Sequence, residues 1–535
     1  MPVLYWSKAA VYEAHETDIG QRGSAMKLLL RKNNQKTTHI SKYGKYLQSL
    51  PVAETALLEQ FFADFNSHNR LAPREKSKMR ADFENALLYY ASVDLAPEEA
   101  RARLAIKNLG GFYSRPPIVW YALDNAAKVY PLSMKHGQMS MFRISMYLKA
   151  PVIPELLQMA LTFTIKRFPT FATTVKKGFF WHYLDTAKRR YTIQKETEIP
   201  CKPLKISGSS SQSFRALYYD NRVSVEFFHI LTDGAGGMVF LKTLIAEYLR
   251  LSGVVMEEKY DAEGILDISE APSQNEAVNE FSRAEKTAAA SGFMDKPAVQ
   301  MSGKLSRTKP CRVLHFKMDA VRLKEAAARN GATITSYMLA LVFVAGKHAT
   351  DELDGIMSIQ TPVDMRRFYP SDTLRNFSMY CGIKLPLRDI TDTQSIIPGI
   401  TLQLSEKASK GKMSEMLNST ERMVGAMRYV PLFIKAPVAR IGYGFLSDRI
   451  FSNTISNLGV VSMPSALAEH IESMDFVLGG ALTNRASCAM VTFNNTVTFS
   501  ISKCTADPSF EEKLYELLAS DGVTPVVEGS MLYEN

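Results

Sequence analysis

The residues best suited to chemistry are a histidine, an aspartate four residues later and a glycine directly after it. These are His229, Asp233 and Gly234. They follow Arg222–Phe228, where apolar and polar residues alternate as in a half-buried strand, and they precede a helical pattern that runs to Arg250. The imidazole is therefore expected at the junction of a strand and a helix, where rigid elements fix its orientation.

His229 is a candidate general base. A histidine has a reference pKa of about 6.5, so it can be largely neutral near pH 7 and accept a proton. Asp233 could hold the local backbone through a charge-assisted contact with an arginine, and Gly234 would let backbone or substrate approach closely. The competing interpretation is a core histidine that ends a strand and does no chemistry.

The elements that would position these residues fall into two blocks of mixed strands and helices. Strand patterns cover 139–148, 170–176, 179–184, 214–219 and 222–228 in the first block, with helices at 154–167 and 234–250. In the second block, strands are expected at 311–318, 355–363, 377–385, 452–456, 474–478, 489–493 and 497–501, and helices at 320–329, 333–347, 391–409, 413–427 and 509–519. The sequence thus predicts two α/β sandwich subdomains, at 116–305 and 306–535.

Two further segments differ in texture from these blocks. Residues 1–115 predict a helical extension, with helices at 53–65, 76–90 and 97–109 and a polar, partly disordered stretch at 20–45. Residues 253–305 are rich in Glu, Ser and Ala and are expected to form a surface connection between the two subdomains.

Composition narrows the function classes. The chain has 535 residues, 46% hydrophobic and 22% charged, which is ordinary for a globular protein. Its net charge of +10 is spread along the sequence without a nucleic-acid-binding motif, so nucleic acid is not expected as a partner. No apolar run is long enough for a transmembrane segment, and no secretory signal is recognised, so a cytoplasmic location is expected.

Metal binding and disulfides are not predicted. The five cysteines, Cys201, Cys311, Cys381, Cys488 and Cys504, are scattered without a Cys-x-x-Cys pair, and no histidine has metal-ligand spacing. Reduced core thiols are the expected state of all five cysteines.

The His229-x-x-x-Asp233-Gly234 motif after an apolar strand resembles the chloramphenicol acetyltransferase-like superfamily of acyltransferases. Segments elsewhere resemble its bacterial alcohol acetyltransferase-like branch, namely Trp120–Pro131, Arg167-Phe-Pro169, Gly178–Trp181, Gly331–Thr335, Pro362-Val-Asp-Met-Arg366 and Ser456-Asn457-Leu-Gly459. The resemblance covers residues 120–518 and leaves out the N-terminal extension.

This resemblance implies two subdomains with a tunnel between them and His229 at its middle. It implies that His229 Nε2 removes the acceptor proton, that Asp233 is structural and pairs with Arg366, and that Ser456 and Asn457 contact the substrate or the oxyanion. An ordinary surface arginine would explain Arg366, and a plain turn would explain Ser456-Asn457-Leu-Gly459.

The function implied is transfer of an acyl group, expected to be acetyl, from a CoA thioester to an alcohol, without a metal. Two departures bear on the branch. Phe228 stands where condensation domains carry a second histidine, and the Asp-Phe-Gly-Trp-Gly element of the plant branch is absent. The alternatives are an acyl-carrier-protein donor, an amine acceptor, or a non-catalytic binding protein with the same fold.

Overall fold

The structure, a computed structural model, describes residues 41–110, 113, 120–128, 130–132, 139–187, 189–205, 212–255, 264–283, 296–437, 449–481 and 483–533. The stretch 20–40 of the predicted disordered segment lies outside these residues. The end of that predicted segment is helical instead: Lys42–Ser49 form helix α1, and the hydroxyl of its N-cap Ser41 accepts the N–H of Gly44 at 3.0 Å.

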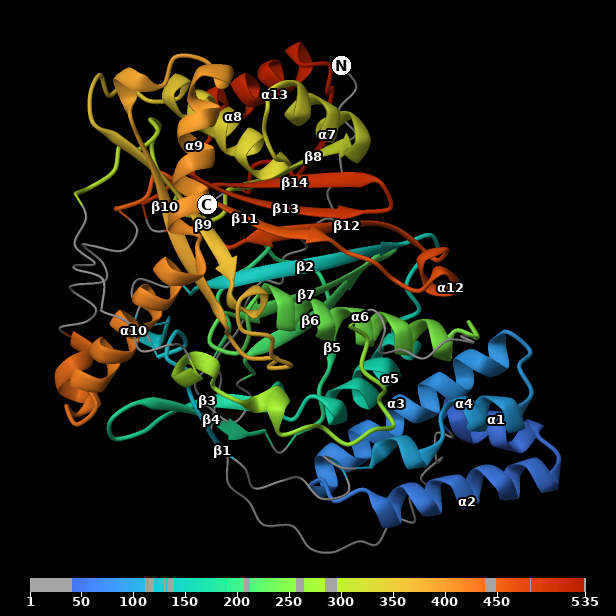
Figure 1. Ribbon diagram of the computed structural model, residues 1–535. Helices are drawn as coiled ribbons and strands as arrows, with labels where there is room; N and C mark the ends of the chain where they lie inside the picture. The colour runs from blue at the N-terminus through green and yellow to red at the C-terminus, as the bar shows by residue number, and fades with distance from the viewer. Residues whose placement is uncertain are drawn as a thin grey trace, which may run out of the picture.

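The N-terminal extension is a group of helices that packs on the first sheet-and-helix block (Figure 1). Its helices are α1, α2 (Val52–His68), α3 (Pro73–Ser92) and α4 (Pro97–Arg103). Phe83 of α3 contacts Phe163 of α5 (Pro154–Thr164) with ring centroids 6.0 Å apart. The single helix predicted for 97–109 is wrong, because α4 ends at Arg103 and a separate 3₁₀ turn covers Ile106–Leu109.

A five-stranded sheet carries the candidate motif. Its strand order is β12-β2-β7-β6-β5, with β2 Met141–Leu148, β5 Ile193–Lys195, β6 Phe214–Tyr219, β7 Arg222–Phe228 and β12 Ile471–Leu478. Helices α5 and α6 (Gly234–Leu251) pack together beside it (Figure 1). The half-buried character predicted for β7 is wrong, since Val223–Phe228 are all buried. The polar side chains of this strand find buried partners, as Ser224 does in Ser145 at 2.9 Å.

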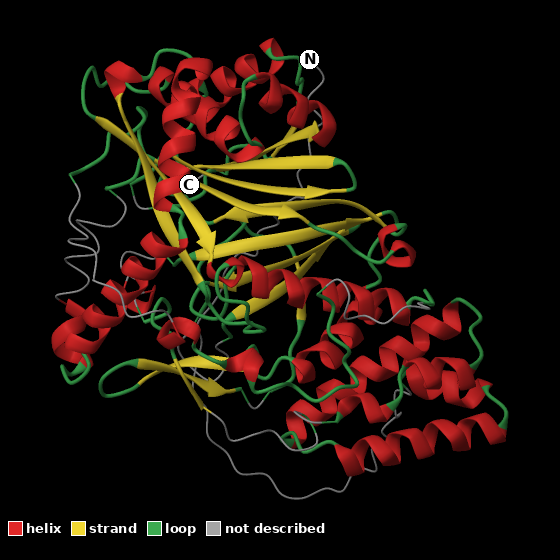
Figure 2. Ribbon diagram, in the orientation of Figure 1, coloured by secondary structure: helices red, strands yellow, loops and turns green. Residues whose placement is uncertain are grey.

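A seven-stranded sheet packs against β12 through β13 and β14. Its order is β10-β9-β11-β13-β14-β8-β15, with β8 Arg312–Asp319, β9 Ile356–Asp364, β10 Ser378–Pro386, β11 Asn453–Val460, β13 Ala486–Phe493, β14 Thr496–Lys503 and β15 Val526–Gly529. Its helices are α7 (Ala320–Arg329), α8 (Ile334–His348), α9 (Thr393–Lys407), α10 (Lys410–Ala426) and α13 (Ser509–Ser520), with the short α12 (Ser465–Ala468) before β12. Figure 2 shows these two sheets in the middle of the molecule, with helices above and below them.

A small third sheet has the order β1-β4-β3, with β1 Trp120–Ala122, β3 Thr173–Lys177 and β4 His182–Thr186. The strand predicted for 179–184 begins only at His182. Gly178 donates its N–H to the Trp181 carbonyl at 3.0 Å and closes a turn instead. A Cβ on residue 178 would lie 2.5 Å from that carbonyl oxygen, which explains the glycine.

The arrangement confirms the predicted α/β class with an added helical N-terminal region. One feature goes beyond the two contiguous blocks of the sequence. Strand β12, from the C-terminal half, pairs antiparallel with β2 and so completes the sheet of the first half. The boundaries at residues 115 and 305 stay predictions. The connection 253–305 is described only in part, with short 3₁₀ turns at Asn275–Ala277 and Glu280–Arg283.

The cysteines and the apolar character of the helices bear on two further predictions. All five cysteines are buried and free of disulfides, as predicted for core thiols. Among the helices that the structure describes, none is both long and apolar enough to cross a membrane.

The Phe83 contact predicts that the helical extension stabilises the rest of the chain. Phe83→Ala removes a fully buried ring and should lower the free energy of unfolding by about 3 to 5 kcal/mol. Urea denaturation would measure the change. Phe179→Ala, at a ring that is 66% exposed, is the matched control and should have a much smaller effect. Equal effects of the two substitutions would contradict a shared core.

Candidate functional site

His229 is the first residue after β7 and is fixed on several sides. Its backbone N–H donates to the Ser140 carbonyl at 2.8 Å. The imidazole stacks on Tyr130 with ring centroids 4.7 Å apart and meets the edge of Phe142 at 5.2 Å. Its Nδ1 lies 2.9 Å from Asn376 Oδ1. Within the described part of the chain, Nε2 has no hydrogen-bond partner. One ring nitrogen is therefore engaged and the other is available.

Asp233 is a structural anchor. It is the N-cap of α6, where its Oδ1 accepts the N–H of Gly236 at 3.1 Å. Arg366 approaches it through both terminal nitrogens, at 2.9 Å and 3.3 Å, which is the contact that the family resemblance implied. Burial works against the charge on Arg366, but the Asp233 and Asp364 carboxylates hold the pKa of its guanidinium above the usual value.

The ion pair also fixes a segment of the second half, Thr373–Phe377. Arg366 donates to the carbonyls of Thr373 and Arg375 at 2.9 Å and 2.8 Å, while Asp233 accepts the N–H of Phe377 at 2.7 Å. Asn376 lies between Arg375 and Phe377 in the chain. The ion pair therefore fixes the backbone on both sides of Asn376, the residue that contacts His229.

Two glycines at the start of α6 allow other chain segments to come close. At Gly236, a Cβ would lie 2.3 Å from the Leu374 carbonyl oxygen, so a side chain would push the 373–377 segment away. At Gly234, a Cβ would lie 2.5 Å from Leu458 Cδ2 of β11. Gly234 thus permits contact between α6 and a strand of the larger sheet, rather than any special backbone conformation.

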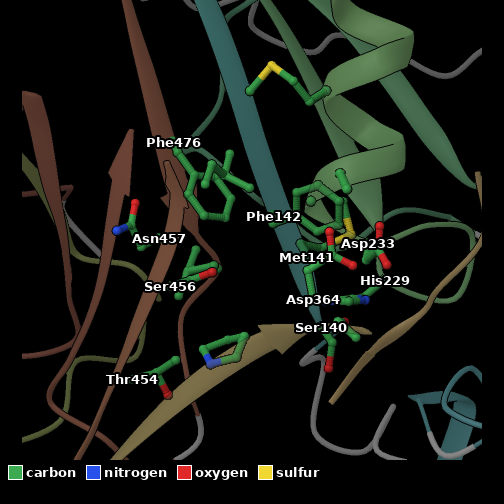
Figure 3. Close-up of a pocket in the computed structure, with 18 of the residues that line it drawn as sticks. Ser140, Met141, Phe142, His229, Asp233, Asp364, Thr454, Ser456, Asn457 and Phe476 are labelled. Carbon is green, nitrogen blue, oxygen red and sulfur yellow. The ribbon is translucent and has the colours of Figure 1, made fainter. Parts of the chain in front are cut away.

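Ser456 and Asn457 lie on β11, across a cavity from His229 (Figure 3). The amide nitrogen of Asn457 donates to Thr335 Oγ1 at 3.3 Å, and its oxygen accepts the Gly459 N–H at 2.7 Å. These bonds accompany a register irregularity in the β11–β13 pairing after Asn457. Asn457 therefore shapes this bulge, while Ser456 stands beside it at the cavity wall.

The cavity has a volume of about 600 Å³, within the usual range for a small-molecule site. Both large sheets contribute to it, with His229, Gly234, Phe142 and Phe476 from the first sheet and its helix, and Gln360, Thr454 and Ser456 from the second. Four methionines, Met139, Met141, Met238 and Met379, add flexible apolar surface. All the predicted site residues except Arg366 line this cavity.

Three residues near His229 were missed by the sequence reasoning: Tyr130, Asp124 and Asn376. Asp124 is fully buried and accepts the Ala127 N–H at 2.6 Å and the Asn376 amide at 3.2 Å, with Arg375 Nη2 at 3.7 Å. Burial raises the pKa of the Asp124 carboxyl, although Arg375 and these donors oppose the rise. Asp124 and Tyr130 lie in the Trp120–Pro131 segment that carried the resemblance, but no sequence signal distinguished Asn376.

The described residues contain no candidate metal-binding site. No group of three or more His, Cys, Asp or Glu side chains there could hold a metal ion.

Comparisons with known proteins establish the fold. No family model matches the chain, and no curated protein matches its sequence. Among solved structures, TRI3 trichothecene 15-O-acetyltransferase from Fusarium sporotrichioides is 14% identical with a TM-score of 0.50, covering 75% of this chain and 94% of that one. TRI101 from the same organism, solved with coenzyme A and T-2, is 11% identical with a TM-score of 0.52, covering 76% and 99%.

The first condensation domain of the CDA synthetase is similar to the same degree, at 14% identity and a TM-score of 0.50, covering 75% of this chain and 97% of that one. The protein therefore has the chloramphenicol acetyltransferase-like fold predicted from the sequence. At these identities the likeness concerns the fold alone.

The buried ion pair generates a prediction. Arg366→Ala should leave the Asp233 carboxylate buried without its counter-charge and lower the free energy of unfolding by about 3 to 5 kcal/mol. Chemical denaturation would measure the loss. Arg388→Ala removes an arginine that is 79% exposed and pairs with Asp389, and this control should cost less than about 1 kcal/mol. A loss in Arg366→Ala as small as in the control would contradict the role of the pair.

Proposed function

We propose that this protein is an acyltransferase that moves an acyl group from a thioester to a hydroxyl group of a small molecule, with His229 as general base. The observation that carries the proposal is the hydrogen bonding of the imidazole. His229 lines a cavity between two sheets, its Nδ1 is held by Asn376, and its Nε2 is without a partner in the described chain. A neutral imidazole held in this way can accept a proton from a bound hydroxyl.

The reaction follows from that geometry. Nε2 takes the hydroxyl proton while the oxygen attacks the thioester carbonyl carbon, so a C–O bond forms and the carbonyl oxygen becomes negative. When this intermediate collapses, the C–S bond breaks and the imidazolium returns the proton to the departing sulfur. The products are an ester and a free thiol, and His229 is again neutral.

The negative oxygen needs a hydrogen-bond donor, and Ser456 is the proposed one. Its hydroxyl belongs to the cavity wall formed by β11, opposite His229 (Figure 3). Asn457 is less suited, because both polar atoms of its amide are bonded to Thr335 and Gly459. Asp233, Gly234 and Arg366 support the site without contacting the reacting atoms.

The proposed substrates are an acyl-CoA, in the simplest case acetyl-CoA, and an alcohol of apolar character. The methionine and phenylalanine side chains of the cavity offer contacts for the apolar part of such an alcohol, beside polar side chains such as Gln360 and Thr454. Phe228 in place of a second histidine favours CoA over a carrier-protein donor by resemblance. We also propose that residues 116–305 and 306–535 are the two acyltransferase subdomains and that the chain belongs to the bacterial alcohol acetyltransferase-like branch.

His229→Ala provides the first test. Thiol release from acetyl-CoA and longer acyl-CoAs, with a panel of alcohols and amines, should fall by about a hundredfold or more because the general base is gone. His348→Ala, at an exposed histidine that ends α8, should keep the full rate. Equal rates in wild type and His229→Ala would exclude His229 as the base. Release only with carrier-bound donors, or only with amines, would replace the proposed substrates, and no transfer at all would favour a binding protein.

Ser456→Ala tests the oxyanion donor. Loss of one such donor should lower kcat by about 10² to 10³ with little change in KM, because the hydrogen bond strengthens as the charge develops. Ser462→Ala removes another hydroxyl from the wall of the same cavity and should leave kcat unchanged. An unchanged kcat in Ser456→Ala would exclude Ser456 as the hydrogen-bond donor to the oxyanion.

A further inference from the structure

Three side chains from distant parts of the chain form a hydrogen-bonded series that ends at His229. Asp124 Oδ2 faces Asn376 Nδ2 at 3.2 Å, and Asn376 Oδ1 faces His229 Nδ1 at 2.9 Å. Asp124 and Asn376 are buried, with 0% and 1% of their surfaces exposed. Solvent therefore does not compete for the bond between these two residues, and their polar atoms must find partners within the protein.

The direction of the series follows from its buried end. Within the described chain, the groups that contact the Asp124 carboxylate are donors, namely the Ala127 N–H, the Arg375 guanidinium and the Asn376 amide. Asn376 turns its NH₂ group toward Asp124 Oδ2, which accepts from it. Its carbonyl oxygen then faces the imidazole. An oxygen can only accept as well, so Nδ1 must carry the proton.

The backbone around Asn376 resists rearrangement of the series. Arg366 holds the carbonyl of the preceding residue and Asp233 holds the N–H of the following one. Arg375 also donates to the Ala122 carbonyl at 2.6 Å, which ties the segment to the strand before Asp124. The amide can therefore respond to its neighbours mainly by rotating its end group.

We propose that Asp124 and Asn376 are positioning residues that hold His229 in the tautomer with Nδ1 protonated and Nε2 free to accept a proton. The inference rests on the proposed function for its catalytic consequence, but the tautomer itself is a property of the protein without substrate. Asp124 acts at a distance, through the orientation of one amide, and does not touch the reacting atoms.

Asp124→Asn tests the direction of the series with almost no change in shape. The new amide oxygen must accept the Ala127 N–H, so its NH₂ group faces Asn376. The Asn376 amide then rotates to offer its oxygen to residue 124 and its NH₂ group to Nδ1, which must accept. The proton moves to Nε2, and kcat for acyl transfer should fall by about a hundredfold while KM for the acyl donor stays the same.

Nitrogen-15 NMR of histidine-labelled protein gives a readout that a merely structural role would not move. The His229 signals are assigned by their absence in His229→Ala. Wild type should show a protonated Nδ1 and an unprotonated Nε2, and Asp124→Asn should show the reverse. Asn376→Leu, which removes the acceptor without reversing it, should give a mixture of both tautomers and a smaller fall in kcat than Asp124→Asn.

Asp389→Asn, at an exposed aspartate, is the matched control and should change neither the spectrum nor kcat. Thermal unfolding of each variant reports whether it is folded, and Asn376→Leu keeps the test open if Asp124→Asn does not fold. A wild-type spectrum with the proton on Nε2, or an Asp124→Asn variant with unchanged tautomer and rate, would overturn the proposal. Absence of acyl transfer by wild type would overturn the proposed function and leave the spectra to decide the tautomer.

Discussion

The buried ion pair between Asp233 and Arg366 is the interaction on which the site depends. Removing two charges from water is costly, and such a pair is stable only when further hydrogen bonds satisfy its remaining atoms. Here Arg366 also binds Asp364 and the Thr373 and Arg375 carbonyls, while Asp233 also caps α6 and accepts the Phe377 N–H. Because Asp233 begins α6 and Arg366 follows β9, the pair joins the two sheet-and-helix layers.

The start of α6 comes close to two segments of the second half of the chain, and this close approach shapes the cavity. Gly236 leaves room for the Leu374 carbonyl, and Gly234 leaves room for Leu458 of β11. Strand β12 strengthens the connection, since it pairs with β2 and packs against β13 and β14 of the other sheet. His229 thus lies where both layers meet, held by an aromatic stack and one amide, and lines a cavity of about 600 Å³.

The sequence predicted the elements of the site better than their surroundings. The strand ending at Phe228 and the helix beginning at Gly234 were both correct, because the periodicity of apolar residues is a local signal. The burial of β7 was misjudged because Ser224 and Glu226 read as solvent-facing until their partners Ser145 and Arg215 are known. Strands β1, β5 and β15 were not predicted. They have three or four residues each, too few for the alternation of apolar and polar residues to be recognised.

The sequence by itself determined that His229, Asp233 and Gly234 share one strand-to-helix turn, because residues so close in the chain are placed by local backbone geometry. Resemblance added Arg366, whose contact with Asp233 the structure contains. Only the tertiary structure decided that Asn376 meets His229 across 147 residues and that Asp124 meets Asn376 across 252. Those contacts arise from the packing of one layer on another, and neither residue stands in a local pattern that reveals its partner.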